Sequence, residues 1–419
     1  MSKGQDKIKI AIIGCGSFAR FFVPLFKGHP SVEKVYVCDL IRERAENYSK
    51  NFDVEIIKSF EDALASDKIN SVAIFTQRFK HGEMVIEALK AGKHVYSAVP
   101  GAIDINELIE IEKLVREKRL TYSMGETGFY RAAAIFCRKE FKKGTFGKFT
   151  FGEAHYNHDI RNMEKSFRSS GGEDWKKFAG IPPMFYPTHS TAMILSTMPG
   201  VYAKKVVAMG YKEGPRTDIY GTEGQNLYNN PFSNTVMLLE LSNGGIARIS
   251  ENRCVGWKAP ETYISQFYGT DGGYEFSVAR HHLATWKKDD DKNVDMIDVT
   301  AQLQPTNIYT QICEDYDTAI QRIAAGAGFF DVAPIQPTKR LPKEYEGLEN
   351  GHNGTHHFLV DDFCRAYDTG KLSPTNIWAV ARWNIPGLMA HQSALEGGKV
   401  MDVIDLGEPP ADWEVLDWE

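Results

Sequence analysis

A glycine-rich turn near the start of the chain carries the clearest chemical pattern in the sequence. Gly14-Cys15-Gly16 is followed by Ala19, which gives the spacing Gly-x-Gly-x-x-Ala. The first glycine of such a turn permits a tight bend, and the second lets the backbone approach a phosphate closely. Asp39 follows roughly 20 residues later, where a carboxylate accepts hydrogen bonds from ribose hydroxyls. The pattern therefore predicts a dinucleotide site, and the charge of Asp39 favours NAD over NADP.

Side chains suited to acid–base chemistry lie further along the chain, in Tyr186-Pro187-Thr188-His189 and at Tyr156. Histidine titrates near neutral pH, so His189 is a candidate to accept a hydroxyl proton. The alternative is a structural histidine that caps a helix after Pro187. Tyr156 and Tyr186 are candidates for an acid or a base, with aromatic packing as the alternative for both.

A polar cluster follows Tyr156 where a predicted strand enters a long loop. It consists of His158, Asp159 and Arg161. These side chains suit hydrogen bonds to substrate hydroxyls, and they equally suit a solvated ion pair. The sequence leaves both interpretations open.

The glycine turn needs a strand before it and a helix after it. Residues 8–13 are almost continuously apolar, as expected of a parallel strand that is covered on both faces. A second apolar strand, residues 35–38, ends at Asp39. Strands and helices continue to alternate as far as Met124, which predicts a doubly wound parallel sheet over residues 1–125.

The pattern changes after residue 125, and residues 126–419 are expected to form a second, α+β domain. Strand-like segments there are joined by short turns, which predicts a large, mostly antiparallel open sheet. These segments are 148–157, 203–210, 235–241, 246–252, 262–269 and 273–277. Residues 159–185 and 302–351 show little regular pattern and are predicted to be long loops that cover a site or form arms.

Composition excludes several classes of protein. The net charge is −6 and the pI is about 6.1, without a basic stripe, so nucleic acid is not expected as a partner. The polar start, Met1–Lys7, leads directly into the first strand, and no apolar run has membrane-spanning length. The six cysteines are scattered, which favours reduced thiols and a cytoplasmic location.

Several motifs together make the chain similar to the Gfo/Idh/MocA family of NAD(P)-dependent carbohydrate oxidoreductases over essentially its whole length. They are Gly14-Cys15-Gly16, Asp39, Thr76-Gln77-Arg78-Phe79-Lys80-His81, Ala91-Gly92-Lys93-His94-Val95 and Gly269-Thr270-Asp271-Gly272. The resemblance implies an N-terminal Rossmann domain, a C-terminal domain with an open sheet, a carbohydrate substrate and a homo-oligomer, either a dimer or a tetramer, paired through that sheet.

Two departures from the family pattern point to one branch of it. Family dehydrogenases usually have Glu-Lys-Pro where this chain has Ala98-Val99-Pro100, and Phe185 replaces the acid of the usual Asp-x-Gly-x-His motif. The altered pattern is similar to NAD-dependent glycosidases such as α-N-acetylgalactosaminidases. Their mechanism, by resemblance, is redox-neutral: carbon 3 of the sugar is oxidised, the leaving group on carbon 1 is eliminated, water adds, and the hydride returns.

The resemblance also suggests a role for individual residues. Those expected to contact the cofactor are Gly14, Gly16, Ser17, Phe18, Asp39, Thr76, His81, Pro100 and Glu126. His189, Tyr156 and Tyr186 are expected to be catalytic, with Tyr156 as the base at carbon 2. His158, Asp159, Arg161 and Trp175 are expected to contact the sugar, although the loop around Trp175 could equally be solvated. His81 could instead cap a helix.

Three functions remain open on the sequence alone. The first is a net sugar dehydrogenase, the second a glycosidase that recycles its NAD, and the third a non-catalytic NAD-binding regulator. Arg42 and Arg44 lie close enough to Asp39 to leave NADP open. His352, His356 and His357 lack a nearby acid or thiol in a known arrangement, so no metal site is predicted.

Overall fold

The computed structural model describes residues 6–212, 216–221, 225–287 and 290–419. Residues 1–5 of the polar N-terminal segment lie outside the described part. The chain divides into two compact units, each described by itself below. The first takes Met1–Thr127, Pro337–Ala381 and Leu406–Glu419, and the second takes Gly128–Gln336 and Arg382–Asp405. The chain thus returns to the first unit in Pro337–Ala381 and Leu406–Glu419. A single boundary at residue 125, as predicted from the sequence, does not include this return.

The first unit is built on a parallel sheet with strand order β3-β2-β1-β4-β5-β6, the order of a dinucleotide-binding Rossmann fold. Its strands are β1 (Ile8–Ile13), β2 (Val32–Cys38), β3 (Glu55–Ile56), β4 (Ser71–Ile74), β5 (His94–Ser97) and β6 (Tyr122–Met124). The three apolar strands β1, β4 and β5 are almost entirely buried, because helices cover both faces of a doubly wound sheet.

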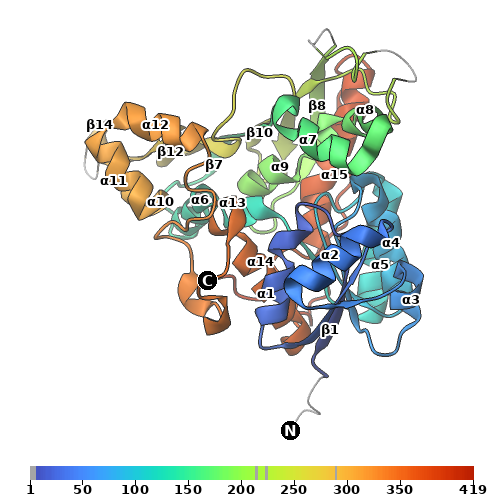
Figure 1. Cartoon of the computed structure of the whole chain (residues 1–419). Coiled ribbons are helices and arrows are strands. Elements are labelled where there is room, and N and C mark those ends of the chain that lie inside the picture. Colours follow the sequence, from blue (N-terminus) through green and yellow to red (C-terminus); the bar gives the residue numbers. More distant parts are fainter. Residues whose placement is uncertain (1–5, 213–215, 222–224, 288–289) are drawn as a thin grey trace. The chain divides into compact units, whose positions relative to one another are not determined.

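The helices of the first unit come from both ends of the chain. They are η1 (Ala19–Phe21), α1 (Val23–Gly28), α2 (Arg42–Phe52), α3 (Phe60–Ala65), η2 (Arg78–Lys80), α4 (His81–Lys90), α5 (Ile105–Lys118), η6 (Thr338–Arg340), η7 (Lys343–Tyr345), α13 (Gly351–Gly354) and α14 (His356–Thr369). Ser59 caps α3 as its type predicts, since its hydroxyl accepts from the Asp62 N–H at 3.0 Å. Helix α14, from late in the chain, packs against the early helix α1 (Figure 1).

The second unit contains a nine-stranded sheet of order β14-β13-β12-β11-β7-β10-β9-β8-β15. Its strands are β7 (Phe149–Asn157), β8 (Ala203–Tyr211), β9 (Asn234–Leu241), β10 (Ile246–Asn252), β11 (Thr262–Gly269), β12 (Gly272–Ser277), β13 (Arg280–Lys287), β14 (Asp290–Asp298) and β15 (Met401–Asp402). The β7–β10 pair is parallel and the other strand pairs are antiparallel. The predicted fold class, a Rossmann domain with a mostly antiparallel second sheet, is therefore confirmed.

Helices cover one face of this sheet around its centre. Helix α9 (Thr188–Leu195) packs on β7, β10 and β11, and α6 (Ala132–Lys142) packs on β11 and α9. The remaining helices of the unit are α7 (Ile160–Gly171), η4 (Gly172–Asp174), α8 (Trp175–Ala179), η5 (Pro183–Phe185), α10 (Thr300–Leu303), α11 (Thr306–Glu314) and α12 (Tyr316–Ala324). Two further helices, η3 (Thr127–Tyr130) and α15 (Ile377–Leu395), cross from one unit to the other in sequence.

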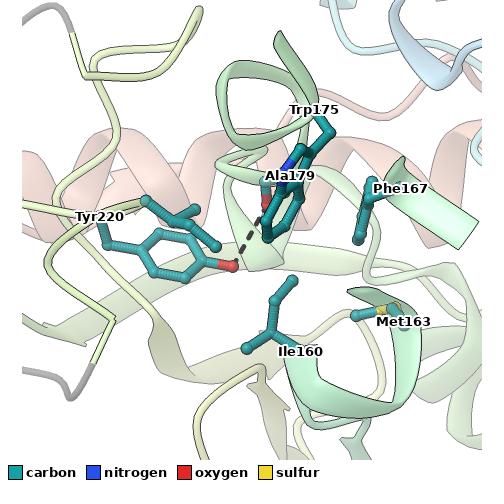
Figure 2. Packing of buried hydrophobic residues seen from close by; sticks show 7 residues of the cluster. Ile160, Met163, Phe167, Trp175, Ala179 and Tyr220 are labelled. Carbon is teal, nitrogen blue, oxygen red and sulfur yellow. Dashed lines mark hydrogen bonds between the residues drawn. The ribbon is translucent and has the colours of Figure 1, made fainter. Parts of the chain in front are cut away.

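The prediction of a long loop at 159–185 is wrong, and that at 302–351 is wrong as far as residue 324, whereas residues 325–350 contain only the short η6 and η7. Helices α7 and α8 occupy most of the first stretch, and α10, α11 and α12 begin the second. The reason is local packing. Ile160, Met163, Phe167 and Trp175 lie at helical spacing and form a hydrophobic cluster of their own (Figure 2). In the second stretch Asp315 caps α12 by accepting from the Thr318 N–H.

Candidate active site

The glycine turn of the first unit has the geometry that a dinucleotide requires. Gly14 has φ +98°, and a Cβ on it would lie 2.5 Å from the Phe75 carbonyl oxygen, so only glycine fits without movement. A Cβ on Gly16 would meet no atom within 4 Å, so this side of the backbone is open to a ligand. The Tyr48 hydroxyl donates to the Gly16 carbonyl and holds the turn from the other side.

Asp39 links the end of β2 to this turn. Its carboxylate accepts from the Cys15 N–H at 2.7 Å and from the Ile41 N–H at 2.8 Å. These bonds use one lone pair of each oxygen, and the others remain suited to ribose hydroxyls. Leu40, next to it, is fully exposed and gives an apolar surface beside the carboxylate. The turn thus combines an open backbone face at Gly16 with acceptor oxygens on Asp39 and an apolar side chain at Leu40.

The other predicted cofactor residues follow the carboxyl ends of neighbouring strands, where ligands bind in open parallel sheets. Thr76 comes after β4, Pro100 after β5 and Glu126 after β6. Glu126 is fully buried, and Thr76 is half-buried with its hydroxyl 3.3 Å from the Met84 sulfur. Ser17 is exposed in the glycine turn.

His81 contacts two of these segments, those that follow β4 and β5. It is the first residue of α4 and only 1 % exposed, with Nδ1 3.0 Å from the Pro100 carbonyl oxygen and Nε2 3.2 Å from that of Thr76. Burial lowers the pKa of His81, although the two carbonyl groups act in the opposite direction. Its ring therefore holds the loops after β4 and β5 together.

Phe18 points into an aromatic cluster of the first unit. Its ring lies 5.0 Å from Phe22, 5.5 Å from His352 and 5.6 Å from His356, between ring centroids. His352 Nδ1 and His356 Nε2 are 2.8 Å apart, which is a hydrogen bond and not a metal-ligand arrangement. In the part of the chain described here, no group of three or more His, Cys, Asp or Glu residues is placed to hold a metal ion.

The second unit brings the predicted catalytic side chains together. Tyr156 is the eighth residue of β7, and α9 begins with Thr188-His189. The rings of Tyr156 and Tyr186 each lie 5.0 Å from the His189 ring, nearly perpendicular to it. His189 Nε2 is 3.1 Å from the Tyr186 hydroxyl, and the Tyr156 hydroxyl hydrogen-bonds to His158 Nδ1. Two Tyr–His pairs thus lie side by side.

A buried charge network lies beneath this site. In the sheet, Glu251 of β10 is the register partner of Tyr156. Its carboxylate accepts from the Ser190 hydroxyl at 2.6 Å and from Arg253 at 3.1 Å, and all three residues are buried. The Arg253 guanidinium lies 4.8 Å from the centre of the Tyr156 ring. The Tyr156 ring therefore packs on a buried Arg–Glu pair.

The predicted substrate residues differ in their surroundings. Asp159 is buried and caps α7, and both of its oxygens accept from Arg161, whose side chain is 70 % exposed. Burial alone would raise the pKa of Asp159, but the bonds from Arg161 and the Val255 N–H outweigh it and lower the pKa. Asp159 therefore orients Arg161.

Trp175 lies apart from these residues, in the core of the helical segment. Figure 2 shows its ring among Ile160, Met163, Phe167 and Ala179, and it is 3 % exposed. The Arg168 guanidinium covers the ring at 4.5 Å from its centre. The structure thus surrounds Trp175 with side chains of its own unit and does not bring it to His189.

Glu261 joins the site without having been predicted from the sequence. Its Oε2 lies 3.8 Å from His158 Nε2, because Thr262 pairs with Tyr156 across β11 and β7. Burial raises its pKa, while Arg131 and His189 draw the pKa down. The position of Glu261 in the sequence did not indicate a place in the site, because the register of two strands about 100 residues apart cannot be predicted from the sequence.

Comparison with known proteins agrees with this picture. Residues 8–126 match the profile of the GFO_IDH_MocA oxidoreductase family, described as having an NAD-binding Rossmann fold. The chain is 22 % identical over 315 residues to a "Glycosyl hydrolase family 109 protein" of Saccharopolyspora erythraea, covering 69 % of this chain and 67 % of that protein. The predicted family resemblance is confirmed. The match to NAD-binding proteins also confirms NAD as the cofactor.

Further relatives differ in how much they cover. A "Glycosyl hydrolase family 109 protein 2" from Shewanella sp. (strain ANA-3) is 28 % identical over 205 residues, or 46 % of this chain and 45 % of its own length. The solved structure of levoglucosan dehydrogenase with NADH and levoglucosan aligns with a TM-score of 0.69 and 16 % identity, covering 95 % of this chain and 99 % of that one. This likeness establishes the shared fold.

Proposed function

We propose that the protein is an NAD-dependent carbohydrate enzyme whose chemistry begins with hydride transfer from a carbinol carbon of a sugar or sugar derivative to NAD. The observation that carries the proposal is the pair of Tyr–His hydrogen bonds in the second unit, Tyr156–His158 and Tyr186–His189. They supply proton acceptors in a chain whose first unit has an NAD-binding fold. NAD, when bound, supplies the hydride acceptor.

Tyr186 and His189 are assigned to the first proton transfer. Oxidation of a carbinol releases the hydroxyl proton, which needs a base that titrates near neutral pH. A hydroxyl that donates to the Tyr186 oxygen passes its proton there while the phenolic proton moves to His189 Nε2, 3.1 Å away. Arg161, held by Asp159, keeps its exposed guanidinium for hydrogen bonds to other sugar hydroxyls.

The residues proposed to hold NAD lie in the glycine turn and along the carboxyl edge of the first sheet. They are Gly14, Gly16, Ser17, Phe18, Asp39, Thr76, Pro100 and Glu126, with His81 fixing the backbone of two of them. Arg42 pairs with Glu46 on α2, so its charge is already partly compensated where a 2′-phosphate of NADP would need it.

A redox-neutral glycosidase is the second candidate, and three observations favour it. Val99 is a buried apolar residue where family dehydrogenases have a lysine. Tyr156 has a hydrogen-bonded histidine and a nearby guanidinium, which suits a base at carbon 2. The curated relatives are named glycosyl hydrolases. On this route the ketone at carbon 3 acidifies the carbon-2 hydrogen, and Tyr156 removes it.

One experiment separates these outcomes. The purified protein is incubated with free sugars and with a panel of 4-nitrophenyl glycosides, with and without added NAD, while NADH and 4-nitrophenolate are recorded. Aglycone release without NADH accumulation identifies the glycosidase, and NADH accumulation that follows added NAD identifies the dehydrogenase. If neither NADH nor 4-nitrophenolate forms with any sugar, the NAD-binding regulator remains and the proposal is contradicted.

We also propose a homo-oligomer, a dimer or tetramer, that pairs through the open face of the second sheet. Large apolar side chains are exposed there on adjacent strands, among them Met209 on β8, Leu238 on β9 and Ile246 on β10. Clustered exposed apolar side chains of this kind mark interaction surfaces. A second copy offers the same surface to itself, as a two-fold interface requires. The scattered thiols support a cytoplasmic location.

No helix of the described residues combines the length and the apolar character that a bilayer crossing requires.

A further inference from the structure

A row of three polar side chains leads from the buried end of β7 toward solvent. The Tyr156 hydroxyl is bonded to Nδ1 of His158, and Nε2 of the same ring lies 3.8 Å from Oε2 of Glu261. Exposure rises along the row, from 7 % for Tyr156 to 20 % for the His158 side chain and 38 % for that of Glu261. A small side-chain rotation would bring the two atoms to hydrogen-bond distance.

Sheet register holds the row in place. Thr262 of β11 is the partner of Tyr156 of β7, so the preceding residue, Glu261, lies beside the residues that follow Tyr156. The Asn157 N–H donates to the Glu261 carbonyl at 2.6 Å and ties the two strand ends together. Backbone pairing thus brings the Glu261 carboxylate to His158.

Asp159 is not an alternative partner for His158. Its two oxygens accept from the Arg161 guanidinium, the Arg161 N–H and the Val255 N–H. That carboxylate is therefore committed to capping α7 and orienting Arg161. Burial raises the pKa of Glu261, and the nearby Arg131, His189 and Lys258 side chains oppose that rise, while His158 lies 3.8 Å from its carboxylate.

We propose that Tyr156, His158 and Glu261 form a triad in which His158 takes the phenolic proton and Glu261 stabilises the resulting imidazolium. The arrangement follows the logic of a nucleophile or base, a histidine and an orienting carboxylate. Tyr156 is the catalytic member, whereas His158 and Glu261 are positioning residues. The inference rests on the proposed glycosidase route, in which the sugar has a ketone at carbon 3.

Each proton and electron pair in this step has a donor and an acceptor. The Tyr156 proton moves to His158 Nδ1, and the phenolate oxygen takes the carbon-2 proton. The electron pair of the broken C–H bond forms the carbon–carbon double bond and expels the leaving group from carbon 1. That group takes a proton from water, the hydroxide adds to carbon 1, and carbon 2 recovers a proton from Tyr156, which regains its own from His158.

The test uses the NAD-loaded full chain in D₂O with the 4-nitrophenyl glycoside that gives the largest absorbance burst at 340 nm. Two quantities are recorded: the burst, which reports hydride transfer, and deuterium at carbon 2 of recovered substrate, which reports Tyr156. We expect Y156F, H158Q and E261Q to keep the burst and to lower the exchange rate about 100-fold, as for loss of a general base. E261D should recover to within about tenfold of wild type.

A pH profile distinguishes positioning from a merely structural role. In wild type the exchange rate should fall on the acidic side, as Glu261 and His158 become protonated, and E261Q should shift that limb. The matched controls are H155Q, from the same strand with a hydrogen bond to Ser265, and E153Q, whose carboxylate pairs with Arg248. Both should exchange at the wild-type rate.

Two results overturn the triad. If wild type shows the burst and the exchange, and E261Q and H158Q show both at unchanged rates and an unchanged pH profile, these residues do not act on Tyr156. If wild type shows no burst with any glycoside, the glycosidase route fails and the triad fails with it, whereas a burst with free sugars would leave the proposed hydride transfer standing. Thermal melting of each variant separates loss of fold from loss of exchange.

Discussion

Alanine substitutions at the two glycines of the NAD turn are expected to have different effects. One should lower the stability of the free protein, and the other should weaken NAD binding. In Gly14→Ala the new Cβ takes a backbone angle of φ +98° and lies 2.5 Å from the Phe75 carbonyl oxygen. The backbone strain costs about 1–3 kcal/mol whether or not NAD is bound. Relief of the contact with a backbone atom requires β1 or β4 to move, which adds to this cost.

Gly16→Ala is the matched control, because its Cβ would meet nothing within 4 Å and its φ is not positive. The free protein should therefore melt as wild type does. The added methyl instead occupies space that the cofactor's pyrophosphate needs, so the cost falls on binding. A penalty of about 2–4 kcal/mol weakens NAD about 30- to 1000-fold, since about 1.4 kcal/mol corresponds to a factor of ten.

The assay is thermal melting of both variants without NAD, followed by calorimetric titration with NAD. Gly14→Ala should lower the melting temperature of the free protein by about 2–12 °C, at about 2–4 °C per kcal/mol for a unit of this size. Gly16→Ala should leave the melting temperature unchanged and lose affinity. If Gly16→Ala binds NAD as tightly as wild type, the open side of the turn is not the pyrophosphate site.

Three other predictions concern stability and assembly. Trp175→Ala should lower the free energy of unfolding, measured by urea titration, by about 3–5 kcal/mol, because the ring lies in a hydrophobic core. Trp175→Phe should lower it clearly less. Equal losses for the two variants would contradict core packing. Burial lowers the pKa of His281 to about 3 and of His94 to about 4, from an ordinary value near 6.5, so the unfolded chain binds more protons below pH 6.5. The free energy of unfolding should be insensitive to these groups above pH 6.5. Between pH 6.5 and 4 it should fall by up to about 1.4 kcal/mol per pH unit for each histidine. Thermal melting at several pH values checks this, and a melting temperature that does not change over that range would refute the assignment. Leu238→Asp should reduce the mass measured by light scattering if the open sheet face pairs two copies, and an unchanged mass would exclude that face.

The Rossmann unit was predictable because its signals are local. The apolar strand, the glycine spacing and Asp39 all lie within residues 8–39, and each constrains the same turn. The alternation of strands and helices then predicts the parallel sheet, which the structure confirms. The return of residues 337–381 to this unit has no such signal, because it depends on packing between segments far apart in sequence.

The helical segment of the second unit shows why the remainder was harder to predict. Helices α7 and α8 carry many charged residues, and Gly171 and Gly172 lie at the junction between them, so their sequence resembles a solvated loop, yet Phe167 and Trp175 are buried in their shared core. Tyr156 and His189 were identifiable as chemistry-bearing residues from their motifs. Their proximity, and the addition of Glu261, depend on the register of β7 with β11 and on the packing of α9.

Stopped-flow absorbance at 340 nm shows directly whether a sugar passes a hydride to the bound NAD. The protein, preloaded with NAD and freed of excess cofactor, is mixed with the panel of sugars and 4-nitrophenyl glycosides. We expect a burst of NADH with at least one sugar, no more than stoichiometric with bound NAD, that H189A abolishes. A protein that holds NAD yet gives neither a burst nor product with every sugar in the panel would contradict the proposed hydride transfer.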